Sequence, residues 1–177
     1  MQIRAAQLDE VPALTELIAR SVRALGAGYY TPRQIELSLV HVFGVDTQLI
    51  HDQTYYVIDH NGTYAGCGGW SKRRTLFGGD QLKAGEDNLL DPLQEAARIR
   101  AFFIDPAYAR RGLGKQLLEL CETAAQSEGF TRFELAATLS GVPLYETCGY
   151  QAIKEFAVPM PEGEHLTIVQ MEKNVGK

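Results

Sequence analysis

The first third of the chain switches between the two hydrophobic periods of regular secondary structure. Residues 3–7 alternate as in a half-buried strand. After Asp9, a typical helix cap, apolar residues recur at steps of three and four. The members of this stripe are Val11, Leu14, Ile18, Val22 and Leu25. The segment Thr31-Pro32-Arg33-Gln34 then combines a capping box with a proline at the first helical position. The pattern predicts a strand followed by two helices.

Residues 55–71 have the pattern of a β-hairpin. Residues 55–58 are rich in β-forming side chains, and Asn61-Gly62 favours a tight turn before a return strand that ends near Ser71. The return strand carries three glycines, Gly66, Gly68 and Gly69. Glycine weakens a strand, so these positions indicate a bulge or the close approach of another backbone.

The remaining pattern alternates strands and helices after one long polar segment. Residues 73–96 lack periodicity and contain three glycines, which predicts a loop insertion within a single domain, 1–177. Further strands are expected at 98–105, 132–137, 151–158 and 165–171, and further helices at 113–129 and 140–148. This order predicts an α/β or α+β fold with a mixed sheet.

Composition and charge exclude several classes of function. The 177 residues include 17 Lys and Arg against 22 Asp and Glu, which gives a net charge of −5. Such a chain has no general attraction to nucleic acid or to anionic lipid, so any anionic ligand needs a local site. No apolar run approaches the roughly 20 residues that cross a bilayer, and because residues 1–4 alternate as in a strand we expect no signal segment. The three cysteines have no metal-binding or disulfide spacing. We therefore expect a cytoplasmic protein without a metal, a nucleic-acid partner or a membrane partner.

The most informative segment is a basic, glycine-rich turn between an apolar strand and an amphipathic helix. Pro106 stops the strand, and Arg110-Arg111-Gly112-Leu113-Gly114-Lys115 leads into the helix. The first turn of a helix offers unpaired N–H groups and the positive end of the helix dipole, which together suit a phosphate. The segment is not a P-loop, because Ala109 and Gln116 stand at two of its key positions, and Leu117 replaces the third glycine of the dinucleotide fingerprint. Tight packing of the helix on the strand is the alternative explanation of the glycines.

Two motifs resemble those of the GNAT superfamily of acetyl-CoA-dependent N-acetyltransferases. Gly112 and Gly114 match the glycines of its motif A, Gln/Arg-x-x-Gly-x-Gly/Ala, whereas Ala109 departs from the leading position. Residues 141–150 resemble motif B, which ends Tyr-x-x-x-Gly-Phe/Tyr, although Thr138 replaces a common Asn. The resemblance covers nearly the whole chain. It implies an α/β (α+β) fold with a mixed, mostly antiparallel central sheet, flanked by helices, whose fourth and fifth strands splay apart.

The resemblance also implies acetyl-CoA as co-substrate and a set of residues that bind it. The pantetheine arm would lie between the splayed strands, and the pyrophosphate would bind the amides of residues 111–115. The implied coenzyme A residues are Phe102, Phe103, Ile104, Arg110, Arg111, Gly112, Leu113, Gly114, Lys115 and Tyr145. Core packing is the alternative for at least one of Phe102 and Phe103.

The implied reaction is direct attack of a primary amine on the thioester carbonyl. A backbone N–H near Phe103 or Ile104 would stabilise the oxyanion. Tyr145 would protonate the departing thiolate, a transfer uphill by about 1.5 pKa units, or about 2 kcal/mol. The candidate base is Glu134, with Asp80, Glu86, Asp87 and Glu95 as alternatives.

The acceptor is expected to be a small-molecule or peptide amine. Tyr29, Tyr30 and Trp70 are the candidate acceptor-binding residues, because they lie in or beside the segments that shape the acceptor site in the family. The alternative function is a non-catalytic acyl-CoA-binding or sensor module on the same fold. An exposed edge of the last strands is a surface on which a homodimer can form.

Overall fold

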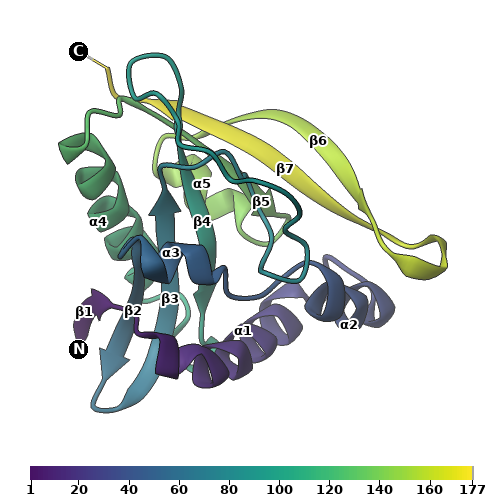
Figure 1. Cartoon of the computed structure of the whole chain (residues 1–177). Coiled ribbons are helices and arrows are strands. Elements are labelled where there is room, and N and C mark those ends of the chain that lie inside the picture. The colour runs from purple at the N-terminus through teal and green to yellow at the C-terminus, as the bar shows by residue number, and fades with distance from the viewer. Residues whose placement is uncertain (177) are drawn as a thin grey trace.

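A seven-stranded sheet of order β1-β2-β3-β4-β5-β7-β6 forms the middle of the computed structural model, which describes residues 1–176 (Figure 1). The strands are β1 (Gln2–Ala5), β2 (Tyr55–His60), β3 (Thr63–Ser71), β4 (Ala97–Ile104), β5 (Arg132–Thr138), β6 (Gln151–Pro159) and β7 (His165–Asn174). Every neighbouring pair is antiparallel except β4 and β5, which are parallel. The prediction of a mixed, mostly antiparallel sheet is confirmed.

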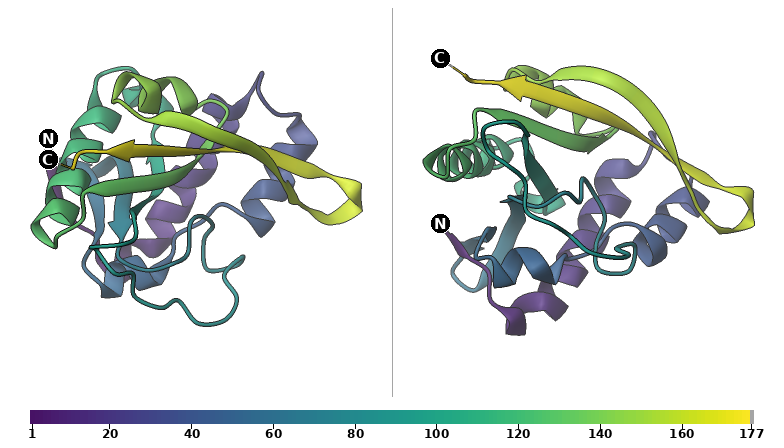
Figure 2. Two further views of the ribbon diagram at one scale, coloured as in Figure 1. Left: turned by 90° about the horizontal axis from the view of Figure 1, so that it is seen from above. Right: turned by 45° about the horizontal axis from the view of Figure 1, so that its top comes forward.

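Helices cover both faces of this sheet (Figure 2). The helices are α1 (Val11–Gly26), α2 (Pro32–His41), α3 (Thr47–His51), α4 (Leu113–Ser127) and α5 (Val142–Thr147). Buried side chains of α1, α2 and α3 form one core cluster on the first face, and those of α4 and α5 belong to a second cluster on the other face. We refer to these as the α1 face and the α4 face. Among the described residues, no helix is both long and apolar enough to cross a membrane.

The glycines of β3 allow close approaches that a side chain would block. A Cβ at Gly69 would lie 2.2 Å from the carbonyl oxygen of Thr54, and one at Gly68 would lie 2.4 Å from the ring of Phe102. The register of β3 against β4 also shifts between Cys67 and Gly69. The prediction of a bulge or close backbone approach at these glycines is therefore confirmed.

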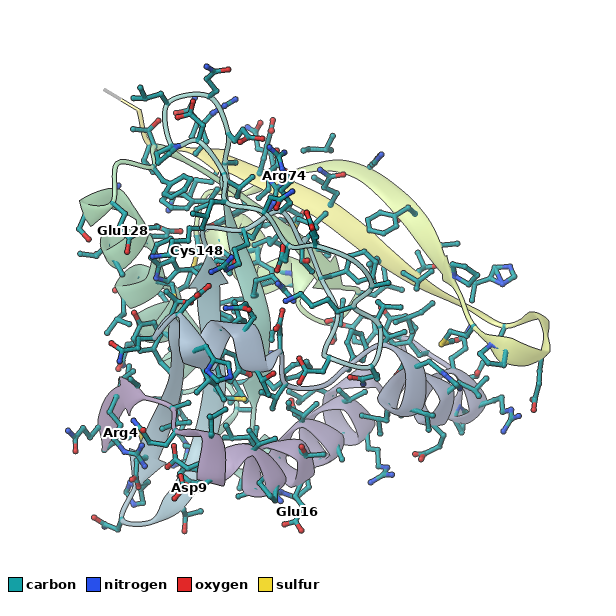
Figure 3. The ribbon with its side chains drawn as sticks, viewed as in Figure 1. Arg4, Asp9, Glu16, Arg74, Glu128 and Cys148 are labelled. Atoms are coloured by element: carbon teal, nitrogen blue, oxygen red, sulfur yellow. The ribbon has the colours of Figure 1, made fainter. Side chains whose placement is uncertain are left out.

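Local signals placed the start of α2 correctly but not the start of α1. Thr31 and Gln34 form the reciprocal capping box, with Oγ1 of Thr31 accepting from the Gln34 amide at 3.1 Å. Asp9 was expected to cap α1, and this is wrong. It lies exposed in a 3₁₀ turn at Leu8–Glu10, before the helix begins at Val11 (Figure 3). The carboxylate of Glu10 instead accepts from the amide of Gln7 at 2.7 Å.

Residues 73–96 cross the α1 face without forming a helix or strand (Figure 1). Their main chain is tied to the segment between α2 and α3: the Gly79 amide donates to Val42 O at 2.9 Å, and the Asp80 amide donates to Val45 O at 3.0 Å. The guanidinium of Arg100, on β4, binds the carbonyl oxygens of Thr75 and Gly78. The segment is therefore fixed to the sheet by hydrogen bonds and not by secondary structure.

The long β6–β7 hairpin reaches across the molecule to α2 (Figure 1). The Tyr30 hydroxyl donates to Thr167 O at 2.7 Å, and Gln34 Nε2 donates to His165 O at 3.1 Å. Arg33 forms an ion pair with Glu162 at the hairpin turn. These contacts join the start of α2 to β7.

The close approach at Gly69 predicts a severe effect of adding one methyl group. Gly69→Ala should destabilise the protein by about 2 kcal/mol or more, because its Cβ would meet backbone atoms that have no room to move. Urea unfolding measures the change. Gly26→Ala is the matched control: its Cβ would make ordinary contacts at 3.6 Å, so the free energy of unfolding should change by less than about 1 kcal/mol. Equal effects of the two variants would contradict the prediction.

Candidate active site

The strands β4 and β5 separate after a short paired stretch. Only Ala97 pairs with Phe133 and Arg98 with Glu134, although β4 continues to Ile104. Ala101 of β4 has a φ of 54°. From Arg100 to Phe103, β4 advances by three residues, whereas its partner β3 advances by only two between Cys67 and Gly69, so β4 carries one extra residue. The sheet therefore has a gap between two of its central strands, beside a bulge.

Main-chain groups of β4 point into this gap. The Asp105 amide donates to Ala65 O of the neighbouring strand at 2.9 Å. Because alternate residues of an antiparallel strand direct their N–H and C=O groups to opposite sides, those of Ile104 face away from β3 and toward the gap. Ile104 thus offers one donor and one acceptor to a ligand that carries amides, and by the same alternation the main-chain groups of Phe102 also face the gap.

The two adjacent phenylalanines of β4 lie on opposite faces. Phe102 belongs to the α4 face and packs near Tyr145, with ring centroids 6.3 Å apart. Phe103 belongs to the core of the α1 face, is only 9% exposed, and makes an edge contact with Phe43 at 5.9 Å. Phe103 is therefore the member of the pair that serves core packing.

The turn before α4 presents a run of free backbone amides. Within the described chain, no acceptor bonds the N–H groups of residues 110–115, and the first helical bond runs from Gln116 N to Gly112 O at 3.1 Å. Arg110 and Gly112 have φ values of 61° and 78°, which turn the chain sharply into the helix. Free amides at a helix N-terminus, next to the positive end of its dipole, form an anion-binding site.

Gly112 and Gly114, the two glycines of this turn, have different structural roles. A Cβ at Gly112 would meet nothing within 4 Å, so the space above it is open to a ligand. A Cβ at Gly114 would lie 2.9 Å from the side chain of Leu144 on α5. Gly112 therefore leaves room for an approaching group, whereas Gly114 allows α4 and α5 to pack together.

Basic side chains surround the open amides. Arg110, Arg111 and Lys115 are all exposed, and Arg111 lies over the ring of Tyr108 at 5.4 Å. The turn itself is anchored by Asp105, whose Oδ1 accepts from the Ala107 amide at 2.9 Å and whose Oδ2 accepts from Arg20 of α1 at 2.9 Å. A locally positive, braced site thus exists on a chain of net charge −5.

Tyr145 lies between the turn and the strands, on α5. Its ring contacts Phe102 and also Tyr150, at 5.8 Å, and the residue is buried. Its hydroxyl makes no hydrogen bond to any described residue, and burial raises its pKa above the usual value. The hydroxyl therefore stays protonated and free to donate.

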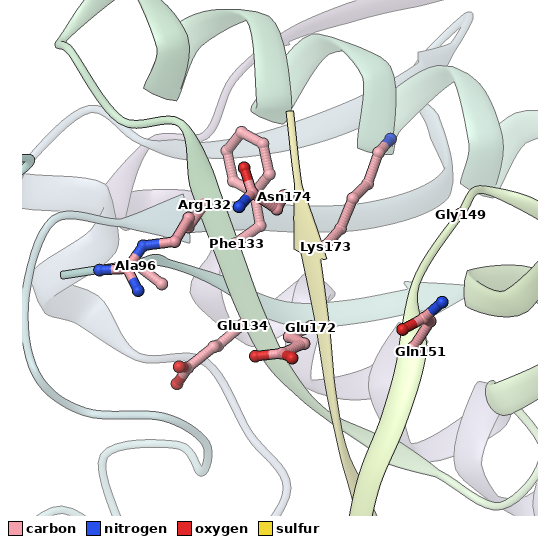
Figure 4. A pocket seen from close by; sticks show the side chains of 9 residues that line it. All are labelled: Ala96, Arg132, Phe133, Glu134, Gly149, Gln151, Glu172, Lys173 and Asn174. Atoms are coloured by element: carbon pink, nitrogen blue, oxygen red, sulfur yellow. The ribbon is translucent and has the colours of Figure 1, made fainter. Parts of the chain in front are cut away.

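Glu134 occupies the paired end of the two strands. Its carboxylate forms an ion pair with Arg98 at 2.7 Å, at the point where β4 and β5 are still joined. It also lines a hollow of about 370 Å³ with Glu172, Gln151 and Arg132 (Figure 4). By strand spacing it lies about 7 Å from Ala136, the next residue of β5 on the same face. A role for Glu134 as the base stays a prediction and needs a water molecule to carry the proton.

The three candidate acceptor residues have different surroundings. Tyr29 is 52% exposed and borders a hollow of about 510 Å³ beside α5 and β6. Tyr30 is buried, and its hydroxyl bridges Leu139 N and Thr167 O, so it supports the fold. Trp70 is 1% exposed and packs against Phe130. Burial removes Trp70 and Tyr30 from the surface that an acceptor can reach in this conformation.

Arg100 is an important residue that the pattern analysis did not single out. It is 1% exposed, and its Nη2 binds Asp46 at 3.0 Å and Gly78 O at 2.7 Å. A charged residue within the apolar run Ile99-Arg100-Ala101-Phe102 is the signal that could have found it. No metal-binding cluster of His, Cys, Asp or Glu occurs among residues 1–176.

Comparisons with known proteins identify both a family and a fold. The model of the acetyltransferase (GNAT) family matches residues 21–150. The fold is similar to that of a GCN5-related N-acetyltransferase from Rhodopseudomonas palustris, with a TM-score of 0.70 and 17% identity over 98% of this chain and 94% of that chain. No curated protein is significantly similar in sequence.

Two further solved structures contain the coenzyme. The PaiA N-acetyltransferase from Thermoplasma acidophilum, in complex with coenzyme A, has a TM-score of 0.65 and 16% identity over 98% of each chain. YncA from Salmonella typhimurium, with acetyl-CoA, has a TM-score of 0.65 and 16% identity over 100% of this chain and 95% of that chain. At these identities the likeness shows the fold alone.

The cysteines should differ in reactivity because they differ in burial. Burial raises the pKa of Cys67 to about 12 and that of Cys121 well above its usual value, whereas Cys148 is partly exposed. Thiolate is the reactive form, so the raised pKa values keep Cys67 and Cys121 in the unreactive thiol form at pH 8. Brief alkylation of the native protein, read by peptide mass spectrometry, should label Cys148 first. Equal labelling of all three cysteines before unfolding would contradict this order.

Proposed function

The chain belongs to the acetyltransferase (GNAT) family, and we propose that it transfers the acetyl group of acetyl-CoA to a primary amine of a small molecule or peptide. The observation that carries the proposal is the run of free amides at residues 110–115, beside a gap in the sheet. An acyltransferase of this kind needs a site for the pyrophosphate and a channel for the pantetheine arm. The free amides of residues 110–115 would provide the pyrophosphate site, and the gap between β4 and β5 would provide the channel.

The coenzyme would be held mainly by backbone. The amides of residues 110–115 would receive the pyrophosphate, with Arg110, Arg111 and Lys115 adding positive charge. The free N–H and C=O of Ile104 would bond the amides of the pantetheine arm within the gap. When bound, acetyl-CoA supplies an activated acyl group with a thiol leaving group.

The amine would approach the thioester carbonyl directly from the α1 face. Two small residues on that face, Ala101 and Ala136, flank the gap and are both partly exposed. A second backbone N–H of β4 on the gap side, that of Phe102 next to Phe103 and beside the bulge, would stabilise the negative charge that develops on the carbonyl oxygen, because the Ile104 amide is assigned to the pantetheine arm and the Phe103 amide faces β3. A preformed donor of this kind is among the largest contributions to catalysis of acyl transfer.

Proton transfers complete the proposed reaction. The free hydroxyl of Tyr145 would protonate the thiolate that departs as the carbon–sulfur bond breaks, and the nitrogen, which carries one extra proton after its attack, would return that proton to the tyrosinate through water. On the amine side, a lysine-like amine costs about 4.6 kcal/mol to deprotonate at neutral pH, whereas an α-amine costs about 1.4 kcal/mol. Glu134 would accept this proton through water, and the cost depends strongly on the acceptor.

A charged side chain at Gly112 should abolish coenzyme binding. In Gly112→Glu, the carboxylate would stand where the pyrophosphate is proposed to lie, so acetyl-CoA should no longer raise the melting temperature. Differential scanning fluorimetry with acetyl-CoA at millimolar concentration measures this shift. Gly163→Glu is the matched control, since Gly163 also has a positive φ, of 73°, and open surroundings. No shift in the wild-type protein, or an unchanged shift in Gly112→Glu, would contradict the proposal.

Removal of the Tyr145 hydroxyl should slow turnover without weakening coenzyme binding. We expect kcat of Tyr145→Phe to fall about a hundredfold, because a positioned general acid contributes at least that much. Steady-state kinetics and calorimetric coenzyme affinity separate the two effects. Tyr150→Phe is the control: it loses a hydroxyl bonded to Glu122 at 2.9 Å, so it should lose stability but keep kcat. An unchanged kcat in Tyr145→Phe removes its assigned role.

Turnover with a panel of primary amines separates catalysis from mere binding. Release of free thiol that depends on the amine, with an acetylated product seen by mass spectrometry, supports the transferase. Stabilisation by acetyl-CoA without turnover of any amine supports the acyl-CoA-binding module instead.

A further inference from the structure

Four phenylalanines from four segments pack in the core of the α1 face, the same core against which Ala101 and Ala136 pack. Phe77 contacts Phe156 of β6 with ring centroids 5.6 Å apart, and Phe43 contacts Phe103 at 5.9 Å. Phe43, Phe77 and Phe156 are only partly buried, although all pack against the same core. We call these four residues the phenylalanine cluster. It is continuous with Ala101 and Ala136, which pack against the same core and flank the gap.

A buried cation of the strand itself holds Phe77 in this cluster. The guanidinium of Arg100 binds the carbonyl oxygens of Thr75, at 3.2 Å, and of Gly78, at 2.7 Å, on either side of Phe77. The next turn of the same segment is tied to Phe43, whose carbonyl oxygen accepts from Gln81 Nε2 at 2.8 Å. The partly buried rings of Phe77 and Phe43 are therefore held in place by hydrogen bonds to the backbone beside them. A loop held by these hydrogen bonds can keep apolar side chains partly exposed to water, and a partly exposed apolar surface of this kind is typical of a ligand-binding site.

The charged groups near the cluster are already paired with one another. Asp46 binds both Arg100, at 3.0 Å, and Lys83, at 2.9 Å, and Lys83 also pairs with Asp87 at 2.9 Å. At the other end of the gap, Arg98 pairs with Glu134. A polycationic acceptor needs free carboxylates, and a phosphorylated or acidic acceptor needs free cations. These groups therefore leave no free charge at the cluster, whereas Glu172, which makes no ion pair among the described residues, lies opposite Glu134 at the paired end of the strands.

We propose that the phenylalanine cluster binds the apolar part of the acceptor, so that the preferred substrate is a primary amine carrying an aromatic or branched aliphatic group. This inference rests on the proposed acetyl transfer and adds the substrate class. The ring or branched chain of the acceptor packs against Phe77, Phe156 and Phe43 while its nitrogen reaches the gap between Ala101 and Ala136. Phe77 is then a specificity-determining residue, and Arg100 is a positioning residue that holds it.

The test compares amines that share a primary amino group but differ in the attached group. 2-Phenylethylamine and isoamylamine represent the proposed class, and ethanolamine and putrescine represent polar and dicationic acceptors. We expect kcat/KM for the first two to exceed that for the last two by about tenfold or more, since a single matched apolar group is worth that much. An equal or higher kcat/KM for putrescine or ethanolamine overturns the inference.

Variants of the same loop test the role of Phe77. Phe77→Ala should raise KM for 2-phenylethylamine about tenfold and leave KM for acetyl-CoA unchanged. Leu93→Ala is the matched control, because Leu93 lies in the same segment, is 90% exposed and is remote in sequence from the cluster. Phe77→Leu keeps an apolar side chain, so its KM for 2-phenylethylamine should lie between those of the wild-type protein and Phe77→Ala. A purely structural role of the ring would not change KM for this amine alone. A uniform loss with all four amines contradicts a specificity role.

The failure of this inference can be distinguished from that of the proposed function. If acetyl-CoA does not raise the melting temperature of the wild-type protein, the transferase itself is contradicted. If acetyl-CoA binds and neither 2-phenylethylamine nor isoamylamine is acetylated, the substrate class is wrong while coenzyme binding stands.

Discussion

Main-chain groups of β4 beyond Arg98 face a gap where a sheet would normally continue, and unpaired groups of this kind cost free energy wherever water is excluded. The bulge at Ala101 bends β4 away from β5, while β5 keeps its place in the sheet through its pairing with β7, from Arg132 to Thr138. Side chains also occupy the space on the α4 face, where Phe102 packs beside Tyr145. A ligand that carries amides would satisfy the free groups of β4, which is the role that we propose for the pantetheine arm of acetyl-CoA.

The other face of β4 carries a buried ion pair, Arg100–Asp46, that positions a loop. Burial lowers the pKa of Arg100, but the guanidinium stays charged because its ordinary pKa lies above 12. A buried pair such as Arg100–Asp46 adds little net stability, since the cost of desolvation offsets much of the attraction. Its value is specificity. The guanidinium of Arg100, fixed by Asp46, also binds the carbonyl oxygens of Thr75 and Gly78. It thereby fixes the position of the loop that carries Phe77.

Signals confined to a few neighbouring residues allowed accurate predictions, and long-range packing did not. The capping box at Thr31 acts within four residues, and the glycines of β3 indicate a close approach at their own positions although the partners, Thr54 and Phe102, are distant in sequence. Helix α3 escaped prediction because five residues are too few to show a period. The burial of Trp70 and the bulge at Ala101 depend on strands far away in the sequence. The motif around Gly112 predicted a turn with free amides, but nothing in it distinguished the open space at Gly112 from the packing task of Gly114.

The raised pKa of Tyr145 does not by itself argue against its role as the acid. What matters for the proton transfer is the difference between the pKa of the phenol and that of the departing thiol, not either value alone. Burial disfavours any anion, and in this protein it raises the pKa of a thiol, Cys67, to about 12 as well as that of Tyr145. A thiolate formed beside Tyr145 would be disfavoured in the same sense. The reference pKa values of a phenol and a thiol differ by about 1.5 units, or about 2 kcal/mol, which is small beside the barrier of an enzymatic reaction. The role that we propose for Tyr145 as the acid is therefore compatible with its burial.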